Sequence, residues 1–290
     1  MRMSVKLINV SHVYAPDTPF EYVALQDINI NIEQTEFIAI IGHTGSGKST
    51  LVQHMNGLLL PTSGSVFVDG TDIAENKTNK ISIRRKVGLV FQYAEHQLFE
   101  ETIYKDIAFG PKNLGLSEDE ICERVKEAME FTGLDYEEYK DRSPFDISGG
   151  QMRRVAIAGV LSMKPDVLIL DEPTAGLDPL GKSEILKSIY ELYKNQNITV
   201  ILISHNMEEV AQLANRIIVM SQAKILMDAT PSEVFSQVEK LSEIGLRAPD
   251  ITYLMKALKE KGCDVDQKVF TVESAKKELV KLLEKGDIHV

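Results

Sequence analysis

The first 90 residues carry short stretches in which apolar and polar positions alternate. Residues 3–10, 28–32 and 65–68 follow this pattern. A period of two predicts strands that have one face in solvent. Between them, Phe37–Ile41 is a continuous apolar run followed by Gly42, which is typical of a strand buried on both faces.

Helical periodicity appears at two places in the first half of the chain. One helix is predicted from Lys48 to about Asn56. A second is predicted to begin after Ser117, because Ser117 and Glu120 have the spacing of a capping box, and to end at Gly133. We expect the second helix to belong to a helical subdomain inserted at about residues 95–163.

The second half alternates apolar runs with helical segments. The runs are residues 166–170, 199–203 and 216–220, and helices are predicted to start at Asp178 and near Asn206. This alternation indicates a parallel sheet. A further capping box at Thr230–Glu233 opens the tail, and later helices are predicted to end at 261–262 and 285–286. We therefore expect one domain over residues 1–230 and a small second domain over 231–290.

Charge and composition exclude several classes of protein. The formal net charge of −11 has the wrong sign for a protein that wraps nucleic acid. The longest apolar stretches are far shorter than the ~20 residues that cross a bilayer, and the N-terminus lacks the apolar centre of a secretory signal. Cys122 and Cys263 are isolated in the sequence, which argues against a disulfide framework or a zinc site. We expect a cytoplasmic chain whose membrane role, if it has one, depends on a partner.

The run from Gly42 to Ser49 fits the pattern G-x-x-x-x-G-K-[ST], and it lies between a predicted buried strand and a predicted helix. Backbone N–H groups of such a loop face phosphates, its Lys reaches the β and γ oxygens, and its Ser ligates Mg²⁺. The predicted nucleotide contacts are Gly42, His43, Thr44, Gly45, Ser46, Gly47, Lys48, Ser49 and Thr50. His43 on its own is more simply explained as an exposed loop residue.

Two adjacent carboxylates, Asp171 and Glu172, follow the apolar run that begins at Val167. The carboxyl end of a strand is where α/β sheets bind ligands. Asp171 is predicted to help hold Mg²⁺, and Glu172 to polarise the attacking water, because phosphoryl transfer depends chiefly on positioning and charge stabilisation.

Further segments occur in a fixed order around these two motifs. They are Gln92 after the apolar run 87–91, the run Ile147-Ser148-Gly149-Gly150-Gln151, the run Ala175-Gly176-Leu177-Asp178, and His205 after the run 199–203. Together they resemble the ATPase subunits of ABC transporters over roughly residues 3–230. The resemblance implies an α/β P-loop NTPase of ABC type, with a mixed sheet core, an antiparallel β subdomain and a helical subdomain. It adds a small α+β C-terminal domain.

The resemblance also implies roles for individual residues. Gln92 contacts Mg²⁺ and the attacking water, Asp178 communicates between two sites, and His205 contacts the γ-phosphate. The signature residues Ser148, Gly149, Gly150 and Gln151 contact the γ-phosphate that is bound to an opposite subunit, so the active unit is a dimer. Tyr14 occupies the position of an aromatic that stacks on adenine. The predicted catalytic residues are therefore Lys48, Gln92, Glu172 and His205. The predicted metal ligands are Ser49, Gln92 and Asp171.

Simpler explanations exist for several of these residues. Ser148 with Gln151 is also an ordinary capping box, and the two interpretations are compatible. Asp178 before Pro179 is an ordinary helix start, a lone His is usually structural, and Tyr14 could be a packing tyrosine of the first sheet.

The segment Gln92–Phe99, with the later run 106–111, resembles the corresponding segment of energy-coupling factor (ECF) transporter ATPases. There this segment docks a transmembrane T protein, which a separate substrate-binding S protein joins. The docking candidates here are Tyr93, Leu98 and Phe99, although interior packing would explain them equally well. The loop beginning at Gly42 and the insertion at 15–22 resemble the A-prime subunit, which pairs with a distinct A subunit. The tail is expected to make dimer contacts.

We therefore predict an ATP-hydrolysing, Mg²⁺-dependent subunit at the cytoplasmic face of the membrane, driving uptake of vitamins or other micronutrients. Two alternatives stay open at this point. One is a homodimeric cobalt or nickel importer ATPase. The other is a soluble ABC ATPase of translation or DNA maintenance, although the chain lacks the tandem cassettes, coiled-coil insert or basic surfaces expected of that class.

Overall fold

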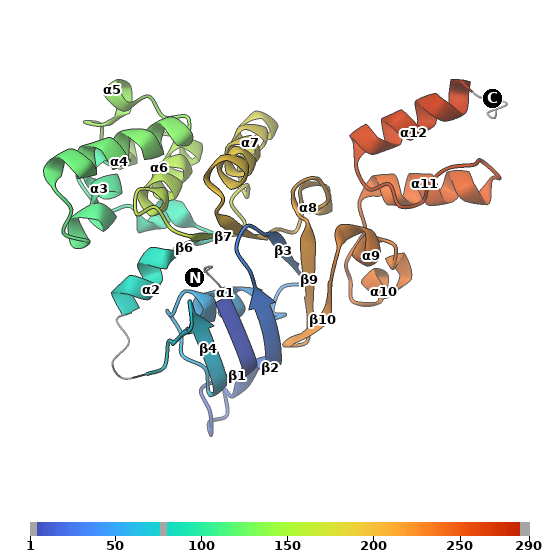
Figure 1. Ribbon diagram of the computed structural model, residues 1–290, viewed down its shortest axis with the longest axis horizontal. Coiled ribbons are helices and arrows are strands. Elements are labelled where there is room, and N and C mark those ends of the chain that lie inside the picture. Colours follow the sequence, from blue (N-terminus) through green and yellow to red (C-terminus); the bar gives the residue numbers. More distant parts are fainter. Residues whose placement is uncertain (1–4, 76–79, 285–290) are drawn as a thin grey trace. The chain divides into compact units, whose positions relative to one another are not determined.

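The computed structural model of the chain describes residues 5–75 and 80–284 (Figure 1). The first two residues of the predicted strand 3–10, and the predicted helix end at 285–286, lie outside the described residues. The chain divides into two compact units. One contains the chain up to Glu36 and from Ser49 to Ile203, and the other contains Phe37–Lys48 and the chain from Ser204 onward.

The first unit begins with an antiparallel sheet. Its strand order is β2-β1-β4-β5. Strand β1 pairs on one side with β2, where Val5 faces Ile32, and on the other with β4, where Val5 faces Val68. The register of the β1–β2 pair shifts three times between Leu7 and Val13. The strands are β1 (Val5–Tyr14), β2 (Tyr22–Ile32), β4 (Ser63–Val68) and β5 (Thr71–Asp72).

Three buried parallel strands form the other sheet of this unit. Strand β7 lies between β6 and β8. Every residue of the three strands is buried, as the continuous apolar runs predict for a parallel sheet. The strands are β6 (Val87–Val90), β7 (Val167–Asp171) and β8 (Thr199–Ile203). The carboxyl end of β7 therefore delivers Asp171.

Helices complete the first unit, and α3, α4, α5 and α6 gather in one group (Figure 1). The predicted capping box at Ser117 is confirmed at the start of α4, whose buried residues include Ile121, Val125 and Met129. The helical elements are α1 (Lys48–Met55), α2 (Lys80–Lys86), η1 (Ala94–Gln97), α3 (Ile103–Asn113), α4 (Glu118–Phe131), α5 (Tyr136–Tyr139), η2 (Pro144–Asp146), α6 (Gly149–Leu161) and α7 (Pro179–Gln196).

The second unit contains a mixed sheet and helices. Strand β9 is parallel to β3 and antiparallel to β10. The predicted capping box of the tail is confirmed at Thr230. The elements are β3 (Phe37–Ile41), α8 (Met207–Leu213), β9 (Arg216–Ser221), β10 (Lys224–Ala229), α9 (Pro231–Phe235), α10 (Val238–Glu243), α11 (Asp250–Glu260) and α12 (Val272–Glu284).

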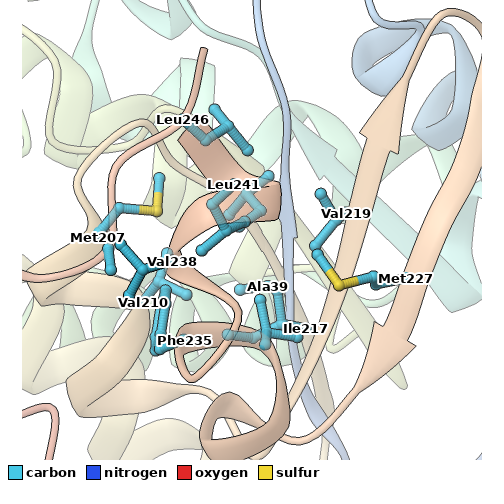
Figure 2. Close-up of a cluster of buried hydrophobic side chains, with 13 residues drawn as sticks. Ala39, Met207, Val210, Ile217, Val219, Met227, Phe235, Val238, Leu241 and Leu246 are labelled. Carbon is cyan, nitrogen blue, oxygen red and sulfur yellow. The ribbon is translucent and has the colours of Figure 1, made fainter. Parts of the chain in front are cut away.

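Short helices of the tail share a hydrophobic cluster with the strands of this unit. Phe235 and Leu241, from α9 and α10, are fully buried together with Ala39 of β3 and Ile217 and Val219 of β9 (Figure 2). A second cluster, separate from the first, contains Met255, Val265, Val269, Ala275 and Leu282. The tail therefore packs in two parts, and the predicted boundary at 230/231 stays a prediction.

The described residues 231–284 are helical or irregular, which corrects the expected α+β character of the tail. Residues 263–271 have no regular structure. Val265 and Val269 bury their side chains in the second cluster without a partner strand. Hydrophobic packing against helices, rather than strand pairing, fixes this stretch.

Candidate functional site

The glycine-rich loop of the second unit encloses its own lysine. Lys48 Nζ donates to the carbonyl oxygens of Gly42 (2.7 Å) and His43 (3.0 Å), and the side chain is 7% exposed. A Cβ at position 42 would lie 2.4 Å from the carbonyl oxygen of Met220 and 2.6 Å from Ser46 Oγ, so only glycine fits there. The loop is therefore built round an ammonium group, as a polyphosphate site requires.

The remaining residues of this loop differ in exposure. Ser46 is fully buried, and its hydroxyl has no hydrogen-bond partner within the described chain. Gly45 and Gly47 have φ of 81° and 104°, which side-chain-bearing residues rarely adopt. Thr44 is exposed, and His43 is half-buried with Nδ1 2.7 Å from the Thr44 carbonyl oxygen. A buried hydroxyl without a partner is costly, and an anion accepting from it would remove that cost.

Ser49 and Asp171 meet in the first unit. Ser49 Oγ donates to Asp171 Oδ2 at 2.9 Å, and Asp171 is 6% exposed at the end of β7. A hydroxyl and a single carboxylate suit Mg²⁺, which keeps several waters and binds substrate phosphates. Within the described residues there is no group of three or more His, Cys, Asp or Glu placed to hold a metal. The donor set thus fits a metal that arrives with a phosphate ligand.

The residue after Asp171 leaves the strand abruptly. Glu172 has φ of 52°, in the left-handed region that non-glycine residues seldom occupy. Its N–H donates to the carbonyl oxygen of Ile203 (3.0 Å) and its own carbonyl accepts from Ala175 (3.1 Å). These bonds hold Glu172 at the carboxyl ends of β7 and β8.

His205 belongs to the second unit, in the turn that opens α8. It is exposed between buried Ser204 and the cap residue Asn206. Ser204 Oγ donates to Glu209 Oε2 (2.9 Å) and accepts from the N–H of Asn206 (3.0 Å). These two hydrogen bonds hold the turn, and the imidazole of His205 is exposed.

Three signature residues and Asp178 line one cavity of about 550 Å³ in the first unit. Ser148, Gly150, Gln151 and Asp178 all contribute to it. Ser148 caps α6, and Gln151 Oε1 accepts from the Ser148 N–H at 2.9 Å. The predicted capping box is therefore confirmed. Asp178 Oδ1 accepts from the N–H of Gly181 (2.6 Å), so its carboxylate is also the ordinary cap of α7.

Two glycines of the signature have different surroundings. A Cβ on Gly150 would lie 3.2 Å from Leu177 Cδ2, which is a close contact within the chain. A Cβ on Gly149 would meet nothing within 4 Å, and its φ is not in the left-handed region. Packing within this chain therefore does not account for a glycine at 149.

Gln92 lies in the turn after β6 and is exposed. Its carbonyl oxygen accepts from Arg153 Nη2 at 2.8 Å. Arg153 is 4% exposed, forms an ion pair with Glu95 at 3.0 Å, and also donates to the carbonyl oxygen of Ala175. This arginine connects the turn of Gln92 with the run that ends at Asp178. The sequence reasoning missed it, because nothing in the sequence separates Arg153 from its neighbour Arg154.

The docking candidates are only partly exposed. Tyr93 and Phe99 are 58% and 59% exposed, whereas Leu98 is 8% exposed. Leu98 is therefore an interior residue, and its proposal as a contact residue is corrected. Phe99 instead meets Phe109, with ring centroids 5.0 Å apart. The N–H groups of Phe99 and Glu100 donate to the carboxylate of Asp106, whose pKa burial raises.

Tyr14 is 38% exposed at the end of β1. Its hydroxyl lies 3.3 Å from Thr50 Oγ1 on α1. The ring is therefore anchored to the helix that follows the glycine-rich loop, and much of its surface stays accessible.

Comparison with known proteins gives consistent matches. Residues 25–175 match the ABC transporter family. The chain is 60% identical to the energy-coupling factor transporter ATP-binding protein EcfA2 of Clostridium tetani, and 58% identical to that of Clostridium perfringens. These alignments cover 97% of this chain and 97% and 99% of the relatives.

Solved structures are similar as well. One is cbiO1 of Clostridium perfringens, described as part of the ABC transporter complex cbiONQ. It is 42% identical, with a TM-score of 0.72, over 87% of this chain and 98% of that one. Another is the ATP-binding cassette MJ0796, a dimer bound to ADP and Pi, which is 28% identical with a TM-score of 0.70, over 78% of this chain and 98% of that one. Within the described residues, no helix has the length and apolar composition of a membrane span.

Proposed function

Since this chain belongs to the ABC transporter family, we propose a role for each part of its ATPase site. The chain is an ATP-binding and ATP-hydrolysing subunit of an ECF-type importer, as its full-length similarity to EcfA2 proteins and to cbiO1 indicates. The prediction of an ECF transporter ATPase made from the sequence is confirmed. The roles of individual residues and the identity of the partners are our proposals.

The glycine-rich loop binds the phosphates of ATP. Lys48 exchanges its bonds to the loop carbonyls for the β and γ oxygens, and loop N–H groups from Gly42 to Ser49 donate to the same phosphates. The buried Ser46 hydroxyl and the enclosed Lys48 ammonium support this role. Thr44 and His43 lie on the accessible side of the loop, and Thr50 anchors Tyr14, which stacks on the base.

Ser49, Asp171 and Gln92 hold Mg²⁺ when the nucleotide is bound. The hydroxyl–carboxylate pair of Ser49 and Asp171 is the single observation that carries the proposal, because it joins the end of the phosphate loop to the end of β7. Held there, Mg²⁺ would neutralise negative charge on the phosphates. Glu172 accepts a proton from the attacking water, and His205 donates to the γ-phosphate.

A second ATPase subunit completes the site. Ser148, Gly149, Gly150 and Gln151 contact the γ-phosphate bound to that subunit, and Asp178 lies beside them. The open space at Gly149 supports this role, since a ligand from outside the chain would fill it. We assign this chain the A-prime position in a heterodimer with a distinct A subunit.

Contacts to membrane proteins are proposed for the segment Gln92–Phe99. The exposed rings of Tyr93 and Phe99 offer a surface to the transmembrane T protein, which an S protein joins to supply the micronutrient. The chain is thereby held at the cytoplasmic face of the membrane. Closure of the ATPase dimer moves the T protein, and hydrolysis reopens it. The domain over 231–290 adds dimer contacts.

A homodimeric cobalt or nickel importer ATPase is the alternative that the sequence left open. Tagged purification from detergent-solubilised native membranes, with mass spectrometry of the copurifying chains, separates the two. A second ATPase with T and S proteins supports the heterodimer. Two copies of this chain with membrane proteins support the homodimer. Recovery with ribosomal or DNA-associated partners alone would contradict the transport role.

A further inference from the structure

Two histidines lie between the strand that carries Tyr14 and the helix that follows the phosphate loop. His12 is on β1, where the register of β1 against β2 shifts, and His54 is on α1, one turn after Thr50. His54 is fully buried and His12 is half-buried. Neither histidine has a part in the phosphate chemistry described above.

These histidines close a ring of contacts that includes Tyr14 and Thr50. The hydroxyls of Tyr14 and Thr50 lie 3.3 Å apart, and the Thr50 carbonyl oxygen lies 2.7 Å from His54 Nδ1. His54 Nε2 lies 3.2 Å from His12 Nδ1. The His12 ring then meets the Tyr14 ring edge-on, with centroids 4.5 Å apart and planes at 78°. Tyr14 is thus held at its hydroxyl and at its ring.

The distances determine where the protons lie when both imidazoles are neutral. His54 Nδ1 must carry its proton, because its neighbour is a carbonyl oxygen, which only accepts. His54 Nε2 then accepts, so His12 Nδ1 carries the proton that lies between the rings. His12 Nδ1 is also 3.2 Å from the Leu60 carbonyl oxygen, which accepts from the same N–H. The neutral pair satisfies each of these contacts.

We propose that His12 and His54 are positioning residues that hold the Tyr14 ring for the base of the bound nucleotide. The inference rests on the proposed stacking role of Tyr14. It predicts that the pair affects recognition of the base and leaves recognition of the phosphates unchanged. It also goes beyond that role, because it assigns the orientation of Tyr14 to two side chains that do not touch the nucleotide.

Protonation should disturb the pair. The groups that face the His54 ring are the His12 imidazole from β1 and the carbonyls of Thr50 and Leu60, with the Tyr14 hydroxyl beyond Thr50. Burial, and secondarily the His12 charge, lower the pKa of His54. If His54 gains a proton at Nε2, that N–H faces the N–H of His12 Nδ1 across the 3.2 Å contact. Because the pKa of His54 lies below its ordinary value, the neutral pair should persist at pH 6.5, and base recognition should weaken only at lower pH.

The test compares two ligands that share the phosphates, MgATP and magnesium tripolyphosphate, by calorimetry on the full-length chain. Tyr14→Ala and His12→Ala should each weaken ATP binding about 3- to 10-fold, the range expected for one aromatic contact, and leave tripolyphosphate binding unchanged. Tyr190→Ala is the control, since Tyr190 is also 38% exposed but lies on α7. Thermal melting verifies that each variant is folded.

A conservative variant provides the second readout. In His54→Gln the side-chain amide can donate to the Thr50 carbonyl and accept from His12, but it cannot titrate. Its ATP affinity at pH 7.5 should match the wild type. The fall in the wild-type ratio of ATP to tripolyphosphate affinity between pH 7.5 and about pH 5 should be absent from the variant.

The outcomes distinguish this inference from the stacking role on which it rests. If Tyr14→Ala weakens ATP binding and His12→Ala does not, the positioning role is wrong and stacking stands. If His12→Ala weakens both ligands equally, the pair supports the phosphate loop instead, and the inference is overturned. If Tyr14→Ala changes nothing, stacking and positioning fail together.

Discussion

Among single residues, Glu172 combines an unusual backbone conformation with the proposed role of base. Its left-handed φ of 52° and the hydrogen bond from its N–H to the Ile203 carbonyl oxygen fix the backbone position from which the side chain extends. Glu172→Gln keeps the shape but removes the base. We expect ATP hydrolysis to fall about 10²- to 10⁴-fold while ATP binding is retained. Measurement of both quantities in the purified complex tests this, and Glu130→Gln on the exposed face of α4 is the control. Unchanged turnover would contradict the assignment.

Arg153 presents a different test, because its role is argued from burial. Arg153→Met leaves Glu95, which is itself only 22% exposed, without its cation. Breaking such a pair on one side should lower the free energy of unfolding by about 3–5 kcal/mol. Arg142→Met removes the exposed pair with Glu138 and should cost at most about 1 kcal/mol. Urea denaturation of both variants measures the difference. If both variants lose the same free energy of unfolding, the buried pair stabilises the fold no more than the exposed one.

At this scale, some features could be predicted from the sequence and others could not. The glycine-rich loop between β3 and α1, and the place of Asp171 and Glu172 at the end of β7, could be predicted, because spacing along the chain reflects local backbone geometry. The burial of Arg153, Leu98 and His54 could not, since each depends on segments far away in sequence, such as the contact of Arg153 with Glu95. Without the fold, a buried arginine and an exposed one look alike.

At the scale of helices and strands, α4 and α6 offer a matched pair. Both begin with a serine in a complete capping box, Ser117 with Glu120 and Ser148 with Gln151. Ser117→Ala and Ser148→Ala should each destabilise the fold by about 1 kcal/mol. Only Ser148→Ala should also reduce hydrolysis in the assembled complex, because only α6 is proposed to face a phosphate. Thermal melts and ATPase assays separate the two effects. Equal ATPase rates of the two variants would mean that Ser148 acts only as a helix cap.

Elements proved more predictable than contacts for a physical reason. Capping boxes and apolar runs are local, so the starts of α4, α6, α7 and α9 could be located from sequence. The tail was harder. Val265 and Val269 are β-branched residues, which favour strands, but they are buried in a cluster with helices, and residues 263–271 form no strand among the described residues. Burial in that cluster prevailed over β propensity.

For the chain as a whole, the packing of its tail is the feature with the largest consequence. Removal of everything after Thr230 would delete Val234, Phe235, Val238 and Leu241 from the cluster they share with β3 and β9. Loss of one such side chain alone costs about 2–5 kcal/mol. We expect this truncation to be insoluble or unfolded.

A second truncation provides the comparison. Ending the chain after Pro249 keeps every fully buried member of the shared cluster and removes the second one. This shorter chain should fold and bind ATP, as measured by circular dichroism and calorimetry. If the chain that ends at Thr230 also folds and binds ATP, the tail is a separate domain, as the predicted boundary at 230/231 implies.

The shared cluster also bears on how such chains diverge. Phe235 and Leu241 contact a common interior with Ala39 on β3, the strand that leads into the phosphate loop. A chimera that exchanges tails between relatives at residue 231 would join mismatched halves of one interior. Crossovers placed after Pro249 would leave that interior intact. We therefore expect folded chimeras to take residues 231–248 from the same parent as β3 and β9.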